Sequence, residues 1–479
     1  MLAERIAEIV GRDHCITDAA ELETYSCDGL THRRVRPAVV ALPATTEEVA
    51  AVVLAAREAG VPIVPRGSGT GLSGGALPVV GCVLVGLSRM NRILEVDLEN
   101  GRARVQPGVT NLSVTAAVAA SGWYYAPDPS SQSVCSIGGN VAENSGGAHC
   151  LKYGFTVNHV LSARVVLDGG EVVEIGGPSL DPVGYDLLAP LVGSEGMFGI
   201  VTEVTLRLLR KPEATRTFLA VFPSTTEAGN AVSGIIGAGI LPAAIEMMDA
   251  LAIQAAKAAT GLAWPDEGAI LLMDADGPAA EAEDTAARAV EIARAAGATL
   301  VRLPADDAER DLMWKGRKCA FAAVGRISPS YLVEDGVIPR SEIARVLAEI
   351  AAMAGAAGLR VANVFHAGDG NLHPLVLYDE RIPGQLQAAE KLGADILALC
   401  VRCGGSITGE HGVGNEKAQA MSLMFSADDL DAMSAVRCAF DPALRFNPGK
   451  VFPTPRLCGE TPGPYRPHPA ELAGQAERW

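Results

Sequence analysis

The chain has 479 residues, is 49% hydrophobic and 20% charged, and carries a formal net charge of −17. This length exceeds what a single core usually supports and predicts two or three domains. The acidic balance would repel a phosphate backbone, which argues against nucleic acid as a partner. The sequence contains no run of about 20 apolar residues, so no direct membrane span is expected.

The N-terminus and the cysteines suggest a cytoplasmic setting. MLAERIAEIVGRD is an amphipathic pattern without the positive and apolar regions of an export signal. The ten cysteines are scattered from Cys15 to Cys458, unlike the dense spacing of a disulfide-stapled secreted protein. Cys400 and Cys403 form a C-x-x-C without a second pair, so thiols packed at a helix end are favoured over a metal site. We therefore expect reduced thiols and no iron–sulfur cluster in this chain.

Residues 38–64 predict a strand, a helix and a second strand. VVALP and VPIVP are β-like, and they flank the helical segment EEVAAVVLAAREAG. Thr45-x-x-Glu48 is a capping box for this helix, and Gly60 ends it. The glycine-rich loop PRGSGTGLSGG follows and contains the letters of the G-x-G-x-x-G dinucleotide fingerprint.

The segment after this loop, ALPVVGCVLVGL, argues against a Rossmann fold. In that fold a helix follows the loop, because the pyrophosphate lies at the helix N-terminus. Pro78, Gly81 and the many valines instead predict a turn and a strand. An NAD-dependent Rossmann dehydrogenase therefore stays the weaker alternative, and Asp97 loses the ribose contact that the fingerprint would assign to it.

The rest of the chain predicts an α+β fold. Short strands alternate with a helix near residues 112–120, and Asp168-Gly169-Gly170 between Val-rich runs predicts a β-hairpin. After Pro212 Ala-rich helices alternate with strands such as AILLMDADG and RVANVFH, which suits an antiparallel sheet covered by helices on one face. The expected parts are a cofactor domain at 1–212 (core 36–212), a substrate or cap domain at 213–424, and a C-terminal region at 425–479 with a loosely ordered tail.

Glycine is unusually dense in two segments, Arg66 to Gly75 and Ser136 to Gly147. Each glycine costs backbone entropy on folding, so this density suggests a use beyond a surface turn. Without side chains in the way, main-chain N–H groups can converge on an anion. Two such nests with flanking hydroxyls suit a diphosphate held between loops, and tight structural turns are the alternative.

Four segments carry a family resemblance: PRGSGTGLSGG, APDPSS, SIGGNVAENSGG and LVGSEGMFGIVTEVTL. Their order and spacing resemble the FAD-binding domain of the vanillyl-alcohol oxidase/PCMH flavoprotein family. The continuation through DPALRFNPGKVFP resembles the flavin subunit of glycolate oxidase and its D-lactate and D-2-hydroxyglutarate dehydrogenase relatives. The resemblance implies a PCMH-type FAD-binding domain of two subdomains, followed by a substrate domain and a short C-terminal helical region that returns to the flavin.

The resemblance also implies where FAD binds. The first loop contains no histidine for a covalent link, so the flavin is expected to be non-covalent. The diphosphate is expected against residues 66–70 and 136–140, with Asn447 closing over the cofactor. The full set of expected cofactor-binding residues is Pro65, Arg66, Gly67, Ser68, Gly69, Thr70, Gly71, Ser73, Pro127, Asp128, Ser131, Ser136, Ile137, Gly138, Gly139, Asn140, Asn144, Ser145, Gly146, Gly196, Ile200, Val201 and Asn447.

Histidines and a glutamate gather in NVFHAGDGNLHP and TGEHGVG. His366 and His373 should face each other across a hairpin and can share a metal ion, to which Glu410 would add a carboxylate. His411 is better placed as a base beside the metal, because consecutive side chains diverge. Structural, hydrogen-bonded histidines are the alternative. The resemblance implies the same ligands and base; zinc is the first choice, with Mn²⁺ or Fe²⁺ left open.

Arg317, in DLMWKGRKCAFAAVGRISP, matches the arginine that binds the substrate carboxylate in the family, and a solvated helix face is the alternative. Relatives that act on diacids carry a threonine and a lysine further along, where Phe321 and Val333 stand here. This difference favours a small monocarboxylate such as glycolate or D-lactate over D-2-hydroxyglutarate.

The expected reaction is oxidation of a 2-hydroxy acid: Arg317 holds the carboxylate, the metal acidifies the hydroxyl, His411 takes the proton, and the hydride passes to flavin N5. The sequence shows no second redox centre, so an external electron acceptor is implied. The resemblance suggests an iron–sulfur subunit and a second flavin subunit, through which the protein would lie at the inner membrane. A non-catalytic FAD-binding subunit is the alternative, and the histidine cluster argues against it.

Overall fold

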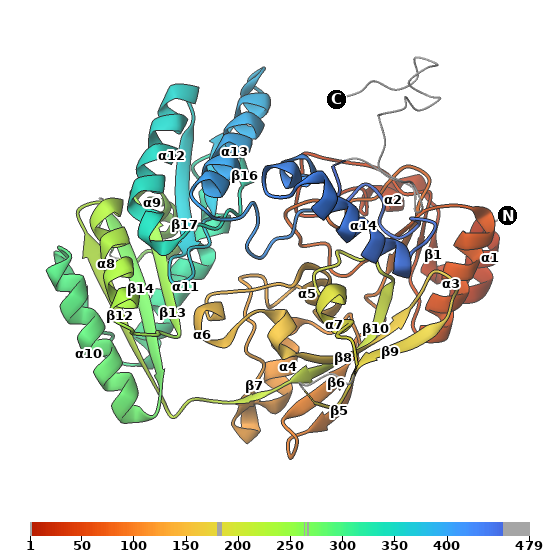
Figure 1. Cartoon of the computed structure of the whole chain (residues 1–479), viewed down its shortest axis with the longest axis horizontal. Helices are drawn as coiled ribbons and strands as arrows, with labels where there is room; N and C mark the ends of the chain where they lie inside the picture. The colour runs from red at the N-terminus through yellow and green to blue at the C-terminus, as the bar shows by residue number, and fades with distance from the viewer. Residues whose placement is uncertain (1, 180–183, 263, 266–267, 454–479) are drawn as a thin grey trace.

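The computed structural model describes residues 2–179, 184–262, 264–265 and 268–453 (Figure 1). Near the N-terminus, a four-stranded sheet has the order β1 (Cys15–Ile16), β2 (Val39–Ala41), β4 (Val83–Gly86) and β3 (Ile63–Arg66). Helices α1 (Leu2–Val10) and α3 (Thr46–Ala59) pack on it through an apolar core, and α2 (Ala19–Glu23) lies between β1 and β2 in the chain. The strand that follows the glycine loop, β4, pairs in parallel with β2 and β3 without an intervening helix, as expected.

The helix start and end predicted around α3 are confirmed, but the predicted capping box is half formed, because the Glu48 carboxylate accepts from the N–H of Ala44 and not of Thr45. Thr45 caps the helix by accepting a hydrogen bond from the N–H of Glu48, and Gly60 ends it at a φ of +66°. The hairpin predicted at Asp168 joins β8 to β9, with Gly170 at a φ of +79°. Turn chemistry at these positions therefore identified element boundaries correctly.

A second sheet has five antiparallel strands. Its order is β5 (Ile93–Asp97), β6 (Arg102–Val105), β10 (Ile200–Arg207), β8 (Val160–Val166) and β9 (Val172–Gly176). One face packs on helices, whereas the other presents charged side chains such as Arg104, Arg164 and Glu203. The helices after β6 are α4 (Asn111–Val118), α5 (Ile137–Glu143), α6 (Cys150–Tyr153) and α7 (Leu188–Leu191), and β7 (Trp123–Tyr124) pairs with β11 (Leu209–Arg210).

The third sheet is the largest, with seven antiparallel strands, and it lies at the left of Figure 1. Its order is β15 (Leu300–Arg302), β12 (Ala214–Phe222), β14 (Ala269–Gly277), β13 (Ala244–Asp249), β17 (Arg360–His366), β18 (Pro374–Tyr378) and β16 (Ser330–Val333). The longest pairing aligns Ala214 with Gly277 and Phe222 with Ala269.

The expectation that helices cover one face of this sheet is wrong, because both faces are covered. One face packs on α8 (Thr225–Gly237), α10 (Ala279–Ala295), α12 (Ile343–Ala357) and α13 (Gln385–Arg402). The other packs on α9 (Ala250–Thr260) and α11 (Asp307–Val324). The physical reason is visible in β14, whose first seven residues are all buried: a continuous apolar run, unlike an alternating one, buries both faces of a strand.

After α13 the chain returns to the N-terminal half. Helix α14 (Ala427–Phe440) is followed by a segment in which Phe446 forms a parallel bridge with Ile63, and Arg445 pairs with Asp168. Cys438 is disulfide-bonded, which differs from the expectation of reduced thiols, whereas Cys400 and Cys403 are free at the end of α13. Within the described residues no helix combines the length and the apolar character that a membrane crossing requires.

Candidate functional site

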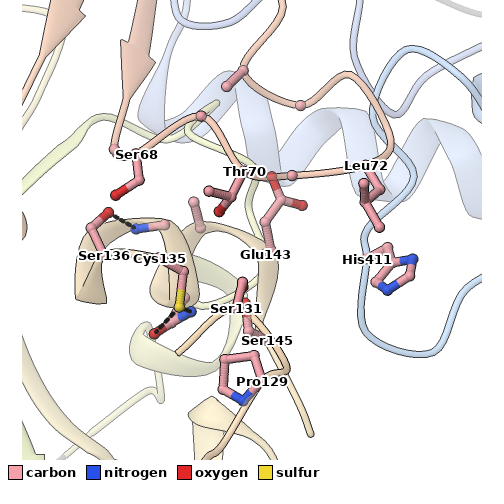
Figure 2. Close-up of a pocket in the computed structure, with 18 of the residues that line it drawn as sticks. Ser68, Thr70, Leu72, Pro129, Ser131, Cys135, Ser136, Glu143, Ser145 and His411 are labelled. Atoms are coloured by element: carbon pink, nitrogen blue, oxygen red, sulfur yellow. Dashed lines mark hydrogen bonds between the residues drawn. The ribbon is translucent and has the colours of Figure 1, made fainter. Parts of the chain in front are cut away.

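A cavity of about 430 Å³ lies between the glycine-rich loops and the large sheet with its helices. Three parts of the chain line it: the first loop from Pro65 to Ala76, the segments around α5 and Gly196, and a wall formed by α11, β16, His373, Glu410 and His411. Figure 2 shows the serine and threonine hydroxyls of the loops at one end of this cavity and His411 at the other. One cavity therefore joins the predicted diphosphate site to the predicted reaction site.

The first glycine loop offers unused donors. Within the described chain, the backbone N–H groups of residues 67–73 donate no hydrogen bond. A Cβ at Gly67 would collide with the Ser136 hydroxyl, and a Cβ at Gly196 would lie 3.3 Å from the Pro65 ring, so the loops approach one another more closely than other residues allow. Backbone N–H groups that make no hydrogen bond, in a loop whose glycines carry no side chains, fit an anionic diphosphate.

The second glycine segment forms the start and end of α5. Ser136 caps this helix through the N–H of Gly139, and Asn144 ends it in the left-handed conformation with a φ of +51°. Glu195 and Asn447, which pack nearby, also have positive φ angles of 50° and 41°. Strained backbone of this kind persists where the surrounding contacts over-determine it, and it concentrates at binding sites.

Most of the expected cofactor residues line the cavity, but some do not. Those on the wall are Pro65, Arg66, Gly67, Ser68, Gly69, Thr70, Gly71, Ser131, Ser136, Gly138, Gly139, Asn140, Ser145, Gly196 and Val201. Those behind the wall are Ser73, Pro127, Asp128, Ile137, Asn144, Gly146, Ile200 and Asn447. The position of a residue in the sequence does not tell which group it belongs to, because the side chains of consecutive loop residues point in opposite directions.

The residues behind the wall hold the loops in place. The Ser73 hydroxyl donates to the His411 carbonyl at 2.9 Å, which ties the first loop to the TGEHGVG segment. The Asn447 amide donates to the carbonyls of Gly75 at 2.7 Å and Glu195 at 2.6 Å. Asp128 accepts hydrogen bonds from both the main chain and the ring of His149. Segments remote in sequence thus fix the shape of the cavity.

The four residues of the predicted reaction centre come together. His366 at the end of β17 and His373 just before β18 face each other with ring centroids 5.1 Å apart, as the hairpin predicted. The Nε2 atoms of both rings lie 3.1 Å from Glu410 Oε1. The ring of His411 stacks on His373 at 4.7 Å, and both face the cavity.

His366, His373 and Glu410 could hold a divalent metal. One ligand atom from each lies within 4.8 Å of the others, and both ring nitrogens of His373 lie near carboxylates: Nε2 is 3.1 Å from Glu410 and Nδ1 is 3.6 Å from Asp335. Ligands ~2.1 Å from a tetrahedral ion stand about 3.4 Å apart, close to the observed spacing. Asp335, His373 and His411 form a second such group, which shares His373.

The pKa shifts of Glu410 and His411 assign different roles to these two residues. Burial favours the neutral form of Glu410, but His366 and His373 outweigh it and hold the pKa of Glu410 well below its ordinary value. Burial lowers the pKa of His411 to about 4, despite the nearby Asp335 carboxylate. Glu410 is therefore an anion fit to bind a cation, and His411 is a neutral imidazole able to accept a proton.

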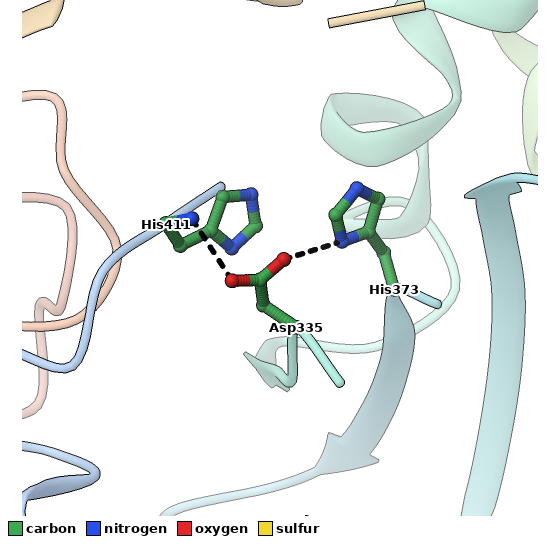
Figure 3. A group of neighbouring side chains, drawn as sticks. All are labelled: Asp335, His373 and His411. Atoms are coloured by element: carbon green, nitrogen blue, oxygen red, sulfur yellow. Dashed lines mark hydrogen bonds and ion pairs between the residues drawn. The ribbon is translucent and has the colours of Figure 1, made fainter. Parts of the chain in front are cut away.

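Asp335, which the sequence did not reveal as a site residue, lies next to both His373 and His411 and supports this centre (Figure 3). Its carboxylate is completely buried and accepts hydrogen bonds from Thr408 Oγ1 at 2.6 Å and from the N–H groups of Gly409 and His411 at 3.0 and 2.9 Å. Lys417 Nζ lies 3.4 Å from the same carboxylate. The only sequence signal was an acidic pair, Glu334-Asp335, beside an apolar strand.

Arg317 lies behind the reaction centre and is 2% exposed. Its guanidinium is 2.5 Å from Glu246, whose other oxygen accepts a hydrogen bond from His366 Nδ1 at 2.8 Å. Glu246 was also missed, and it orients His366 so that Nε2 points to Glu410. Arg317 is absent from the cavity wall, whereas its neighbour Lys318 lines it together with Phe321, Tyr331 and Val333.

Comparison with known proteins gives consistent matches over both halves. The family "FAD binding domain" matches residues 37–176, and "FAD linked oxidases, C-terminal domain" matches residues 211–451. Glycolate oxidase subunit GlcD of Escherichia coli (strain K12) is 51% identical over 92% of this chain and 88% of its own length. GlcD of Bacillus subtilis (strain 168) is 38% identical, with 94% and 96% covered.

More distant matches extend this pattern. A D-lactate dehydrogenase of Anaerostipes hadrus is 31% identical over 94% of this chain and 97% of its own length. The crystal structure of p-cresol methylhydroxylase superposes with a TM-score of 0.79 over 94% of this chain and 96% of that one. At 17% identity, this last likeness shows the fold alone.

Proposed function

The chain belongs to the FAD-linked oxidase family, and from this premise we propose that it oxidises a small 2-hydroxy acid to the 2-keto acid. One observation carries the proposal: His373, Glu410 and His411 open onto the same cavity as the glycine loops. Acid–base groups and a diphosphate site in one cavity are the parts that oxidation at a bound flavin requires.

The glycine loops would hold FAD non-covalently. The N–H groups of residues 67–72 make no hydrogen bond within the described chain and belong to residues that line the cavity, and the hydroxyls of Ser68, Thr70 and Ser136 add further donors for a diphosphate. FAD, when bound, supplies the acceptor for the α-hydride of the substrate. The loops position the cofactor and exclude water from it.

His366, His373 and Glu410 would hold a divalent metal, for which two imidazoles and a carboxylate favour Zn²⁺. Such an ion supplies Lewis acidity that makes a substrate hydroxyl easier to deprotonate. His411, held neutral by burial and stacked on His373, would accept the hydroxyl proton. Glu246 and Asp335 fix the ligand His366 and the backbone of His411 respectively.

Two neighbouring cations are candidates for the substrate carboxylate. Arg317 is the family's anchor by resemblance, but here it pairs with buried Glu246. Lys318 lines the cavity one residue further along α11. Phe321 and Val333 place apolar side chains on this wall, which supports glycolate or D-lactate over the diacid D-2-hydroxyglutarate.

The most similar relatives suggest a complex. Both GlcD proteins are described as subunits of glycolate oxidase, so we propose that this chain passes electrons to an external acceptor within a multi-subunit assembly. An iron–sulfur subunit and a second flavin subunit are the proposed partners, and through them the protein would lie peripherally at the inner membrane. The alternative of a non-catalytic FAD subunit is disfavoured by the complete His366–His373–Glu410–His411 cluster.

The deciding experiment is anaerobic mixing of the purified protein with a panel of D- and L-2-hydroxy acids while the flavin absorbance is recorded. We expect glycolate or D-lactate to bleach the flavin, and D-2-hydroxyglutarate to bleach it much more slowly. The matched pair Arg317→Gln and Lys318→Gln identifies the carboxylate anchor, because only loss of the anchor raises the substrate KM strongly. If no hydroxy acid bleaches the wild-type flavin, with or without added Zn²⁺, the proposal is refuted.

A further inference from the structure

Glu143, the last residue of α5, is a cavity-lining acid that the mechanism above does not use. Its Oε2 atom is buried and has no hydrogen-bond partner among the described residues. A Cβ at Gly75 would collide with Oε1, and a Cβ at Gly412 would collide with Oε2. Gly75 and Gly412 are 337 positions apart in the sequence, and both lack the side chain that would collide with this carboxyl group.

The charges around Glu143 oppose its ionisation. Two other buried acids lie nearby: Glu195 accepts hydrogen bonds from the N–H groups of Val413 and Gly414, and Asp28 accepts them from Leu30 and Ala76. Glu143 accepts no hydrogen bond from any residue in the described part of the chain. Burial first, and then the neighbouring Glu195 and Asp28 carboxylates, raise the pKa of Glu143 well above its ordinary value, although Lys417 and Lys450 act in the opposite direction.

The position of Glu143 along the cavity indicates what it faces. Thr70 of the first glycine loop lies on one side of Glu143 and His411 on the other (Figure 2), and Gly412, next to His411, lies against Glu143 Oε2. The carboxyl group therefore stands between the diphosphate end and the reaction end. A flavin ring placed there carries four hydrogen-bond acceptors on its polar edge, the two carbonyl oxygens, N1 and N5, against the single donor N3–H. An ionised carboxylate would face these acceptors with its own lone pairs, whereas a carboxylic acid has a proton to donate.

We propose that Glu143 is a neutral carboxylic acid that donates a hydrogen bond to the flavin ring and thereby favours the reduced cofactor. Reduction adds negative charge to the ring, and a preorganised donor stabilises developing charge in a dry site. A carboxylate anion at the same place would instead disfavour the reduced cofactor. The inference rests on the proposed function only for the identity of the cofactor, and needs no particular substrate.

The test is the midpoint potential of bound FAD, measured by dye-mediated chemical reduction without substrate. Glu143→Gln keeps a neutral donor, and Glu143→Ala removes it. We expect Glu143→Gln to match the wild type and Glu143→Ala to have a lower potential. Glu174→Gln, an exposed acid on β9, serves as the matched control and should change nothing. An Ala variant with the wild-type potential, or Gln and Ala variants that both have a higher potential, would overturn the proposal.

A second measurement on the wild-type protein covers the case in which the variants fold poorly or lose FAD. The infrared difference spectrum between oxidised and reduced protein should contain the C=O band of a protonated carboxylic acid that shifts on reduction. A spectrum without such a band would overturn the proposal. Because both measurements use chemical reduction, a failure to oxidise any hydroxy acid would refute the proposed function and leave this inference standing.

Discussion

Asp335 is expected to hold together the loop that carries Glu410 and His411, and its replacement by asparagine tests this. The substitution keeps the shape of the side chain but removes its charge. It also turns one of the two acceptor oxygens into a donor, so that a single amide oxygen is left to accept from the N–H groups of Gly409 and His411. Lys417, which is 2% exposed and 3.4 Å away, then becomes a buried cation without its closest carboxylate.

The expected loss follows from these contacts. Removing one member of a buried ion pair typically costs about 3–5 kcal/mol, because the remaining charge stays buried. Glu334 and Glu416 stay near Lys417 and offset part of its charge, so we expect a value at the lower end. The free energy of unfolding of a whole domain is about 5–15 kcal/mol, so this loss is a large fraction of it. It corresponds to a fall in Tm on the order of 10 °C.

The assay is thermal unfolding, followed in parallel by flavin fluorescence and far-UV circular dichroism. The double variant Asp335→Asn/Lys417→Met removes both charges of the pair and should recover part of the lost Tm, since the unpaired lysine is gone and the buried Glu334 and Glu416, whose pKa values burial already raises, then take up protons. If Asp335→Asn melts within about 2 °C of the wild type, or if the double variant is no more stable than the single one, the assigned role of this carboxylate is wrong.

Three further predictions concern the same site and its surroundings. His411→Ala should lower turnover by on the order of 10² to 10⁴ while FAD stays bound, and wild-type-like flavin reduction in anaerobic stopped flow would remove His411 from the mechanism. Dialysis against a chelator should abolish substrate-driven bleaching without releasing FAD, and Zn²⁺ should restore it; full bleaching at undetectable metal content would contradict a metal role. Burial lowers the pKa of His149, but Asp128 outweighs this and raises it to about 9, so the pair stabilises the fold fully below pH 6.5 and loses this contribution as the pH rises to about 9. The Tm difference between wild type and Asp128→Asn should therefore be larger at pH 6 than at pH 9, and an equal difference at both would argue against the ion pair.

Local chemistry in the sequence predicted much of this architecture. Turn and cap residues such as Thr45, Gly60 and Gly170 specify backbone conformations by themselves, so their elements were identified correctly. His366 and His373 lie seven positions apart across a tight turn, and a hairpin brings such residues together whatever the rest of the chain does. The continuous apolar run in β14 is itself a sequence sign that both faces of the sheet are covered.

The residues that were missed have partners far away in the chain. Glu246 is 120 positions from His366, and Asp335 is 76 positions from His411. Such pairs depend on how sheets and loops come together, which no local pattern encodes. Arg317 shows the converse: a motif identified the residue, but its pairing with Glu246 follows from the packing of α11 against β13. Residues that position other site residues without lining the cavity are therefore the part of a site that a single sequence reveals least.

The two hydrogen bonds of Asn447 have a consequence for biosynthesis. They join residue 447 to Gly75 and Glu195, 372 and 252 positions earlier. During translation the glycine loop leaves the ribosome long before the amide that fixes it, so the complete cofactor site can form only when nearly the whole chain has been made. Flavin loading is then expected to be a late event, because a chain released before Asn447 would lack both hydrogen bonds that fix the loop.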